Sequence, residues 1–202
     1  MVLLRYMECI ILAAGLANRM SNQVKLLLPY EGKPLIVHAV RAALDAVDRV
    51  VVVTGFHAEA VVEALRTLLS QHLSIVYNEQ FHLGQFASTQ VGVRAISPDT
   101  DFFISMADLP LIRSDHYRLL IPMLETHDAI RPYVGLTPGH PVLHHRRLRE
   151  EILRLPSSSS MNTFLNQKDV IRYDADDPAW ITDIDTKEDY LHIIGPISPS
   201  VT

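Results

Sequence analysis

The sequence contains a single cysteine, Cys9, which excludes an internal disulfide and any zinc or iron–sulfur site built from several cysteines. Long hydrophobic runs are also missing. The longest unbroken stretch of apolar or small residues, Cys9 to Ala17, has nine residues, whereas a membrane-spanning helix needs about 20. We therefore expect no contact with a membrane. Residues 1–8 lack the small-residue cleavage site of a secretory signal, so we expect a cytoplasmic protein in a reducing compartment.

Positive charge is scarce: 18 Lys and Arg residues stand against 23 Asp and Glu residues, and there is no long basic run. A nucleic-acid binder carries a wide basic surface, so we expect no nucleic acid as partner and a small molecule instead. The GxxxxGK[ST] and GxGxxG patterns of P-loop and dinucleotide-binding proteins are missing as well. Apolar residues make up 48% of the 202 residues, which is enough to fill the core of one domain spanning residues 1–202.

Strand and helix patterns alternate along the chain. Continuous apolar or β-branched runs predict buried strands at Met7–Ala13, Arg49–Thr54 and Phe102–Met106. Helical spacing of apolar residues predicts helices that begin at Pro34 and at Ala58. Shorter patterns predict helices at 87–95, 114–127 with Ser114 as the cap, 146–155 and after Thr186, and strands at 74–77, 129–131, 141–144, 170–173 and 180–183. This alternation predicts a three-layer α/β fold with a mostly parallel, Rossmann-like central sheet.

Ligands of parallel sheets bind at the carboxyl ends of strands, so the residues that follow each strand are the candidates for a site. The first strand is followed by small residues up to Gly15 and then by Arg19 and Lys25. Small residues let backbone N–H groups approach an anion, and two cations neutralise it. The alternative is a surface turn with solvated charges. The combination on one short loop favours a triphosphate site.

Two groups of carboxylates occupy similar positions. Asp108 follows Phe102–Met106 after a single alanine, Ala107, and Asp183 and Asp185 precede the last helix. Carboxylates at such positions suit Mg²⁺ held against phosphate oxygens. The alternatives are that Asp108 caps a turn and that Asp183 or Asp185 caps the last helix. Alternation along the strand expected at 180–183 would direct Asp183 and Asp185 to the same side.

Six ordered blocks give a more specific indication: LAAGLANRM with KLLLPYEGKPLI, VVVVTGF, YNEQFHLGQFASTQVGV, MADLPLI, RPYVGLTPGHPVL and DIDTKEDY. Over nearly the whole chain they resemble the MobA-like nucleotidyltransferase family, and most closely its molybdenum cofactor cytidylyltransferase branch. The resemblance implies a glycosyltransferase-A-like fold and Mg²⁺-dependent transfer of a nucleoside monophosphate from its triphosphate onto the phosphate of molybdopterin, with release of pyrophosphate. LAAG rather than LAGG resembles the branch that uses CTP. A molybdenum hydroxylase would then be the partner that receives the product.

The resemblance also implies a role for individual residues. Those lining the nucleotide would be Leu12, Ala13, Ala14 and Gly15, and those contacting its base and ribose would be Gly84, Gln85 and Ser88. Catalysis and phosphate binding would fall to Arg19, Lys25 and Asp108. Asp108 would be the principal Mg²⁺ ligand and Asp185 the second. The segment facing the acceptor would be Gly139, His140 and Pro141.

One departure from the family pattern concerns the loop between Arg19 and Lys25. The family reads RMGxxK, whereas Ser21 replaces the glycine here and Lys25 comes one residue later, so the loop must bulge to bring Lys25 to the phosphates. Two alternatives therefore stay open. One is a nucleotidyltransferase with a guanine base or another phosphorylated acceptor, and the other is a non-catalytic carrier of molybdenum cofactor. The joint presence of Asp108, Asp185, Arg19 and Lys25 argues against the carrier.

Overall fold

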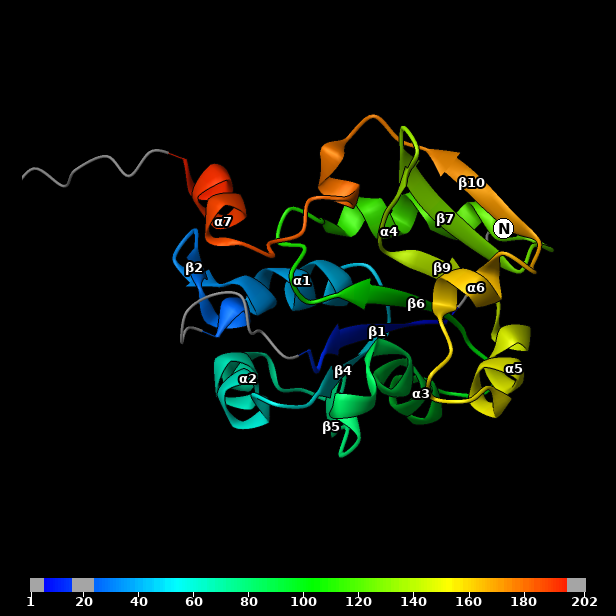
Figure 1. Cartoon of the computed structure of the whole chain (residues 1–202), viewed down its shortest axis with the longest axis horizontal. Coiled ribbons are helices and arrows are strands. Elements are labelled where there is room, and N and C mark those ends of the chain that lie inside the picture. Colours follow the sequence, from blue (N-terminus) through cyan, green and yellow to red (C-terminus); the bar gives the residue numbers. More distant parts are fainter. Residues whose placement is uncertain (1–5, 16–23, 196–202) are drawn as a thin grey trace, which may run out of the picture.

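The computed structural model describes residues 6–15 and 24–195. Within these residues the centre is a sheet of eight strands in the order β10-β7-β9-β6-β1-β4-β5, with β8 paired to β7 (Figure 1). Strand β1 (Met7–Ala13) lies between β4 (Arg49–Thr54) and β6 (Asp101–Met106) and is parallel to both. The bounds of β1 and β4 are those predicted, because both strands are buried on two faces and therefore read as continuous apolar runs.

The other strands extend the sheet on both sides. Next to β4 lies β5 (Leu73–Tyr77), and β10 (Val170–Asp174) is parallel to β7 (Ala129–Val134) at the far edge. Between β6 and β7 runs β9 (Val142–His144), antiparallel to both, and β8 (Thr137–Pro138) forms a hairpin with β7. All strands on the main path except β9 thus run in one direction, which confirms the mostly parallel sheet.

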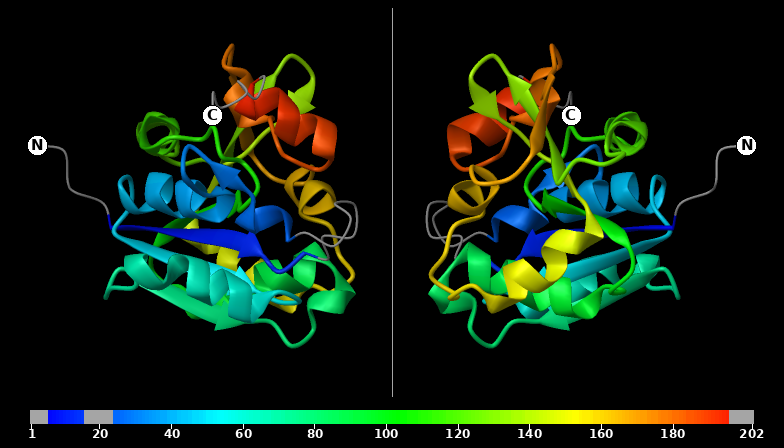
Figure 2. Two further views of the ribbon diagram at one scale, coloured as in Figure 1. Left: turned by 90° about the vertical axis from the view of Figure 1, so that its left-hand side faces the viewer. Right: turned by 90° about the vertical axis from the view of Figure 1, so that its right-hand side faces the viewer.

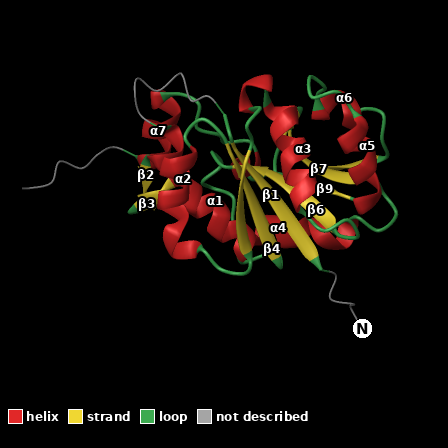
Figure 3. Ribbon diagram, turned by 90° about the horizontal axis from the view of Figure 1, so that it is seen from below, coloured by secondary structure: helices red, strands yellow, loops and turns green. Residues whose placement is uncertain are grey.

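Helices cover both faces of the sheet and confirm the three-layer architecture. The first layer consists of α1 (Leu35–Leu44), α2 (Ala58–Leu65) and α4 (Ser114–Leu120). The second consists of α3 (Gln85–Ala95), α5 (Arg149–Arg154) and α6 (Met161–Leu165). Figure 3 shows α1 and α2 on one side of β1 and β4, with α3 and α5 on the other. None of the helices in the described part of the chain has the length and hydrophobicity that crossing a membrane requires.

A small third cluster joins the last helix to a hairpin. Strands β2 (Pro29–Tyr30) and β3 (Lys33–Pro34) are antiparallel, and α7 (Lys187–Ile194) packs near them through Tyr190, whose hydroxyl donates to the carbonyl oxygen of Pro29 at 2.6 Å. Figure 2 shows α7 on the side of the molecule opposite to the β4–β5 edge of the sheet. The hairpin was not predicted, since its turn depends on positive φ angles at Glu31 and Gly32.

Two predicted elements differ from the structure. The strand expected at 180–183 is absent: Pro178–Trp180 form a 3-10 turn, and the chain that follows up to Thr186 has no regular structure. The β-branched and aromatic residues there suggested a strand, but the Asp177 carboxylate accepts the N–H of Ala179 at 2.9 Å and fixes the turn instead. Ser114 is the first residue of α4 rather than its cap, a position that Arg113 occupies.

The lengths of several helices and strands also differ. Strand β7 ends at Val134 rather than at residue 131. The segments 58–69, 114–127 and 146–155 each contain a shorter α-helix joined to a 3-10 turn, at 66–68, 121–123 and 146–148 respectively. Pro122 interrupts the second of these because it lacks an N–H donor. The five-residue helix α6 was not predicted, since one turn and a half carries too little periodicity to be recognised.

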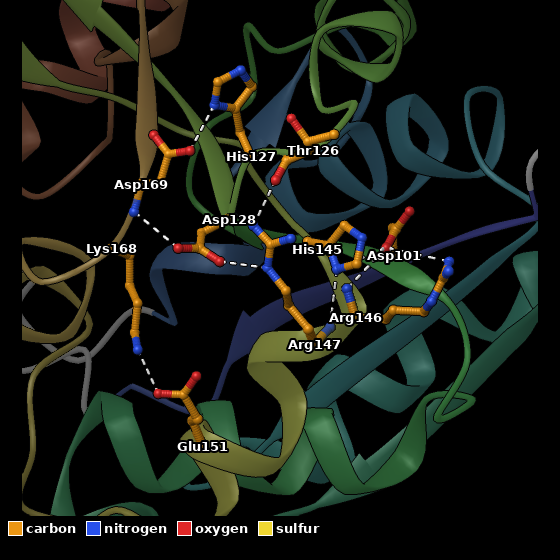
Figure 4. A network of polar contacts seen from close by, with 10 residues as sticks. All are labelled: Asp101, Thr126, His127, Asp128, His145, Arg146, Arg147, Glu151, Lys168 and Asp169. Carbon is orange, nitrogen blue, oxygen red and sulfur yellow. Dashed lines mark hydrogen bonds and ion pairs between the residues drawn. The ribbon is translucent and has the colours of Figure 1, made fainter.

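A network of polar contacts connects the amino ends of the parallel strands (Figure 4). These ends lie at the edge of the sheet opposite to the one where Asp108 is found. Asp128, directly before β7, accepts a hydrogen bond from Arg147 Nε at 2.6 Å and another from the Asp169 N–H, directly before β10, at 2.9 Å. Asp101, at the start of β6, accepts the N–H of Arg146 at 2.8 Å. Four segments that are distant in sequence, around residues 101, 128, 146–147 and 169, are thereby held together at this edge.

Candidate functional site

Asp108 is the second residue after the carboxyl end of β6, and hydrogen bonds of the backbone fix its position. The N–H of Ala107 donates to the carbonyl oxygen of Leu12 at 3.2 Å, so β1 and β6 end side by side. The N–H of Ile184 donates to the Asp108 carbonyl oxygen at 3.2 Å, which brings the chain before α7 to the same place. The Asp108 side chain is only 14% exposed. A carboxylate this buried requires cationic or hydrogen-bonding partners.

Lys25 supplies that partner. Its Nζ lies 2.6 Å from Asp108 Oδ2 and 2.9 Å from Asp185 Oδ1, and its side chain is 13% exposed. Burial opposes the charged form, but the carboxylates of Asp108 and Asp185 outweigh burial and raise the pKa of Lys25, so the ammonium stays protonated. Although the preceding loop is one residue longer than the family pattern, Lys25 reaches the end of β6.

Two further carboxylates approach from the segment before α7. Thr186 and Asp189 form the capping box of that helix, so the alternative in which Asp183 or Asp185 caps it is wrong. The Asp189 carboxylate also accepts the N–H of Asp185 at 3.1 Å and holds that residue beside Lys25. Burial, followed by the negative charges of Asp108 and Asp185, raises the pKa of Asp183. Three carboxylates therefore gather around one ammonium.

The carboxylates fit a divalent cation that is shared with a bound phosphate. Asp108 Oδ1 is buried and has no hydrogen-bond partner among the described residues, so one oxygen remains available to a cation. No three His, Cys, Asp or Glu side chains in the described ranges are arranged to hold a metal ion. Mg²⁺ is usually bound by one or two carboxylates together with substrate phosphates and water. Asp108 and Asp185, the two carboxylates that contact Lys25, are the residues that would hold it.

Two neighbouring cavities open at this edge of the sheet. The Asp108 cavity, of about 230 Å³, is lined among others by Met106, Asp108, Gly139, Trp180 and Asp183. The Arg131 cavity, of about 480 Å³, lies over β6, β9 and β7 and is lined among others by Leu12, Gly84, Arg131, His144 and Ser157–Ser160. Residues that line both cavities are Gln85, Pro138 and His140. One ligand can therefore occupy both.

The residues predicted to contact the nucleotide divide into accessible and buried groups. Leu12, Gly84 and Gln85 line the Arg131 cavity, and Gly84 has the positive φ of 104° that favours glycine. Ser88 is buried, and its hydroxyl accepts a hydrogen bond from Asn78 Nδ2 at 3.0 Å. Ala13 and Ala14 are buried at the end of β1, whereas Gly15 is exposed. Arg19 and Ser21 lie outside the described residues.

The predicted acceptor segment lies between the two cavities. A Cβ on Gly139 would stand 2.5 Å from the carbonyl oxygen of Trp180, so only glycine fits this close approach. The half-buried His140 lines both cavities, and burial lowers the pKa of its imidazole, so the ring is neutral at pH 7. Pro141 follows it through a cis peptide bond and is buried. Gly139 and His140 thus face the cavities, and Pro141 supports them from behind.

Two residues that line the cavities were given no role in the prediction from sequence. Trp180 contributes to the wall of the Asp108 cavity. Arg131 lines the larger cavity from the middle of β7 and received no role. The signal that marks it is a charged residue between Ile130 and Pro132 in a strand whose first four residues are buried.

Comparison with known proteins places this geometry in a family. The model of the MobA-like NTP transferase domain matches residues 9–172, most of the chain. The chain belongs to that family. It is therefore a nucleotidyltransferase by family, as the six sequence blocks predicted. Asp183 and Asp185 lie beyond the matched residues, so their contribution to the site comes from the structure.

Two relatives match over almost their full lengths. The chain is 29% identical over 184 residues to the molybdenum cofactor cytidylyltransferase of Escherichia coli, covering 91% of this chain and 93% of that protein. It is 28% identical over 196 residues to nicotine blue oxidoreductase of Paenarthrobacter nicotinovorans, covering 92% and 95%. The chain is thus about equally identical in sequence to two proteins that are named for different activities. Overall identity does not decide between these activities, so the decision depends on the residues of the site.

Solved structures confirm the fold. A nucleotidyl transferase from Methanothermobacter thermautotrophicus superposes with a TM-score of 0.81 at 25% identity and covers 94% of this chain and 96% of its own. Rv0371c of Mycobacterium tuberculosis, crystallised with manganese, superposes with a TM-score of 0.76 at 21% identity and covers 94% and 98%. The three-layer nucleotidyltransferase fold predicted from the sequence is confirmed by these matches.

Proposed function

We propose that residues 1–202 form one Mg²⁺-dependent cytidylyltransferase domain that moves CMP from CTP onto the phosphate of molybdopterin and releases pyrophosphate. The observation that carries this proposal is the contact of Lys25 with Asp108 and Asp185 at the carboxyl end of β6. The near full-length similarity to a molybdenum cofactor cytidylyltransferase supports the choice of base and acceptor.

The reaction requires charge neutralisation rather than a strong base. A phosphate monoester has its second pKa near 6, so at neutral pH the acceptor is already an anion able to attack the α-phosphorus. An oxygen of the acceptor phosphate bonds to that phosphorus, and the bond to the departing pyrophosphate breaks. The barrier arises largely from repulsion between two anions, and fixed cations at the site lower it.

Lys25 is suited to this task because its ammonium is positioned and permanently charged. We assign it to the phosphates of CTP, with Arg19 as a second cation on the same loop. Small residues from Ala13 to Gly15 leave room for those phosphates. Asp108 would hold Mg²⁺ together with Asp185, and the ion would supply positive charge to the leaving pyrophosphate.

The acceptor would enter from the opposite side, along Gly139 and His140. We place the nucleotide against Leu12, Gly84 and Gln85, which leaves the β7–β9 half of the two cavities for the acceptor. Burial keeps the imidazole of His140 neutral, so this residue would bind the acceptor by hydrogen bonding. A neutral imidazole does not repel the Arg131 guanidinium, and it does not compete with Lys25 for the phosphate. The product would then pass to a molybdenum hydroxylase.

Pyrophosphate release tests the proposal directly. Purified protein, Mg²⁺ and molybdenum cofactor are incubated with CTP, GTP or ATP in separate reactions, and each is repeated without acceptor. We expect release with CTP only and only with acceptor. Release with GTP instead would move the protein to the guanylyl branch. If no pyrophosphate is released with any of the three nucleotides although nucleotide binding is measurable, the result would contradict the proposed acceptor and favour the carrier function.

A further inference from the structure

Arg131 occupies an unusual position for a charged residue. It lies on β7, which pairs with β9 on one side, and it is opposite Arg172 of β10 on the other. Its relative exposure is 7%, and its guanidinium lines the Arg131 cavity. Placing a full positive charge in such a position costs several kcal/mol unless an anion compensates it.

No such anion is present among the described residues. Arg131 Nε is buried without a hydrogen-bond partner, and no carboxylate of the described ranges forms an ion pair with the guanidinium. The Tyr133 ring, whose centroid is 5.8 Å from Arg131 Cζ, is a distant and weak partner. Burial lowers the pKa of Arg131, which is the expected effect on a cation removed from water without compensation.

His144 lies on the adjacent strand and lines the same cavity with a second unused polar atom. Its ring stacks on Phe102 with centroids 5.2 Å apart, and Nδ1 lies 3.0 Å from the Val142 carbonyl oxygen. A carbonyl oxygen only accepts, so the proton is on Nδ1. Burial lowers the pKa of His144 to about 3, so the ring is neutral, and its buried Nε2 is an acceptor without a partner.

The rim of the cavity is polar and fixed in place. Ser157–Ser160 line it with their hydroxyl groups. The segment is anchored through Gln90, whose Nε2 donates to the carbonyl oxygens of Ile152 and Leu155 at 2.9 and 2.8 Å, and whose Oε1 accepts from Ser157 Oγ at 3.3 Å. The cavity therefore combines one buried cation, one buried acceptor and a row of hydroxyl groups.

We propose that Arg131 and His144 bind the end of the acceptor remote from the phosphate that reacts, and that this end carries an electron-rich oxygen beside a hydrogen-bond donor. The oxygen would pair with the Arg131 guanidinium and the donor with His144 Nε2. Because Gln85, Pro138 and His140 line both cavities, one acceptor reaches from Arg131 to Asp108. The inference rests on the proposed function only in taking the reacting group to be a phosphate.

Three variants isolate the role of the charge. Arg131→Met removes the charge at similar length, Arg131→Lys keeps it, and Arg172→Met is the matched control on the neighbouring strand, where Arg172 is exposed and pairs with Asp174 at 2.6 Å. Loss of a charge-assisted hydrogen bond predicts a roughly 10- to 100-fold rise in KM for the acceptor in Arg131→Met. We expect KM for CTP to change less than about threefold, Arg131→Lys to recover part of the loss, and Arg172→Met to match the wild type.

Anion binding gives a readout that does not depend on catalysis. Inorganic phosphate and sulfate are titrated into protein labelled with ¹⁵N in its imidazoles, and the Nε2 resonance of His144 is followed. We expect a saturable shift in the wild type and in Arg172→Met, and none in Arg131→Met. We also expect Arg131→Met to melt at the same temperature as the wild type or higher, because it removes an uncompensated buried charge.

The outcomes separate this inference from the proposed function. One outcome is that the protein binds phosphate or sulfate with an Arg131-dependent shift of the His144 Nε2 resonance and yet transfers no nucleotide to molybdenum cofactor. That outcome supports the binding site at Arg131 and contradicts the acceptor proposed above. Anion binding and acceptor KM unchanged in Arg131→Met would overturn the inference, as would a loss of CTP affinity with acceptor affinity intact. A lower melting temperature with unchanged binding would make Arg131 a structural residue and overturn it too.

Discussion

The ammonium of Lys25 lies 2.6 Å from Asp108 Oδ2, which joins the loop after β1 to the end of β6 before any nucleotide is bound. The same ammonium contacts Asp185, so the segment before α7 completes the group. The charge of Asp108 is therefore compensated within the protein. A triphosphate that takes Lys25 as its partner exposes carboxylate oxygens that then need a cation, so nucleotide and divalent metal are expected to bind together.

Replacing Asp108 separates catalysis from binding. In Asp108→Asn we expect turnover to fall by about 10²- to 10³-fold, because the amide cannot neutralise or hold a divalent cation as a carboxylate does. The dissociation constant for CTP measured by calorimetry without metal is expected to change less than about tenfold. Asp115→Asn, an exposed residue of α4, is the control. Unchanged turnover in Asp108→Asn would show that this carboxylate has no part in the reaction.

Lys25→Met tests the pH range over which the ion pairs contribute to stability. The folded-state pKa of Lys25 is raised above its ordinary value of 10.5, so its contribution is fully present below pH 10.5 and disappears as the pH rises through the folded value. The difference in melting temperature between wild type and Lys25→Met should stay constant from pH 7 to 9 and narrow above 10.5. A difference that already narrows by pH 9 would contradict the raised pKa.

Asp189 connects the last helix to the site. Its carboxylate accepts the N–H groups of Thr186 at 2.7 Å and of Asp185 at 3.1 Å. Asp189→Ala removes both bonds, and we expect it to lower the free energy of unfolding by about 1 kcal/mol and to reduce turnover because Asp185 loses its anchor. Glu188→Ala, in the same helical turn, is the control. If Asp189→Ala and Glu188→Ala had equal turnover, the position of Asp185 would have no influence on catalysis.

The polar network at the opposite edge predicts an acid-dependent loss of stability. Burial opposes ionisation of Asp128, but the hydrogen bonds from the Asp169 N–H and from Arg147 hold its pKa below the ordinary value of 3.8. A depressed pKa stabilises the folded state above pH 3.8, and this contribution is lost as the pH falls through the folded value. Asp128→Asn should therefore melt lower than the wild type at pH 7, and the difference should shrink below pH 3.8. Asp99→Asn, in an exposed turn, should show no such convergence.

Much of the fold could be predicted because local pattern and tertiary environment agree. The run Arg49–Thr54 is β-branched and buried, and its bounds were recovered without error. Thr186 and Asp189 form the capping box that their spacing predicts. The segment 180–183 shows the limit, since its side chains suit a strand, but no neighbouring strand is available and Asp177 stabilises a turn.

The site was predictable in its strand-end residues and not in its contacts. Asp108 and Lys25 could be named from their positions after predicted strands, but the ion pair between them depends on how the loop crosses the sheet. Asp183 was left undecided between a cap and a ligand until the structure showed Thr186 as the cap. Arg131 was missed because a single charge within a strand has meaning only when the absence of a nearby carboxylate is known.

The antiparallel strand β9 bears on how substrate specificity can evolve in such a protein. Its three residues lie between the β5-β4-β1-β6 half, to which we assign the nucleotide, and the β7–β10 half, which contains Arg131. Because β9 runs against its neighbours, its first residue rather than its last lies at the edge of the site. If the nucleotide and the acceptor bind to different halves as we propose, mutation can alter the two halves separately. We then expect a descendant to change its acceptor through substitutions in β7 and β10 while its triphosphate site stays unchanged.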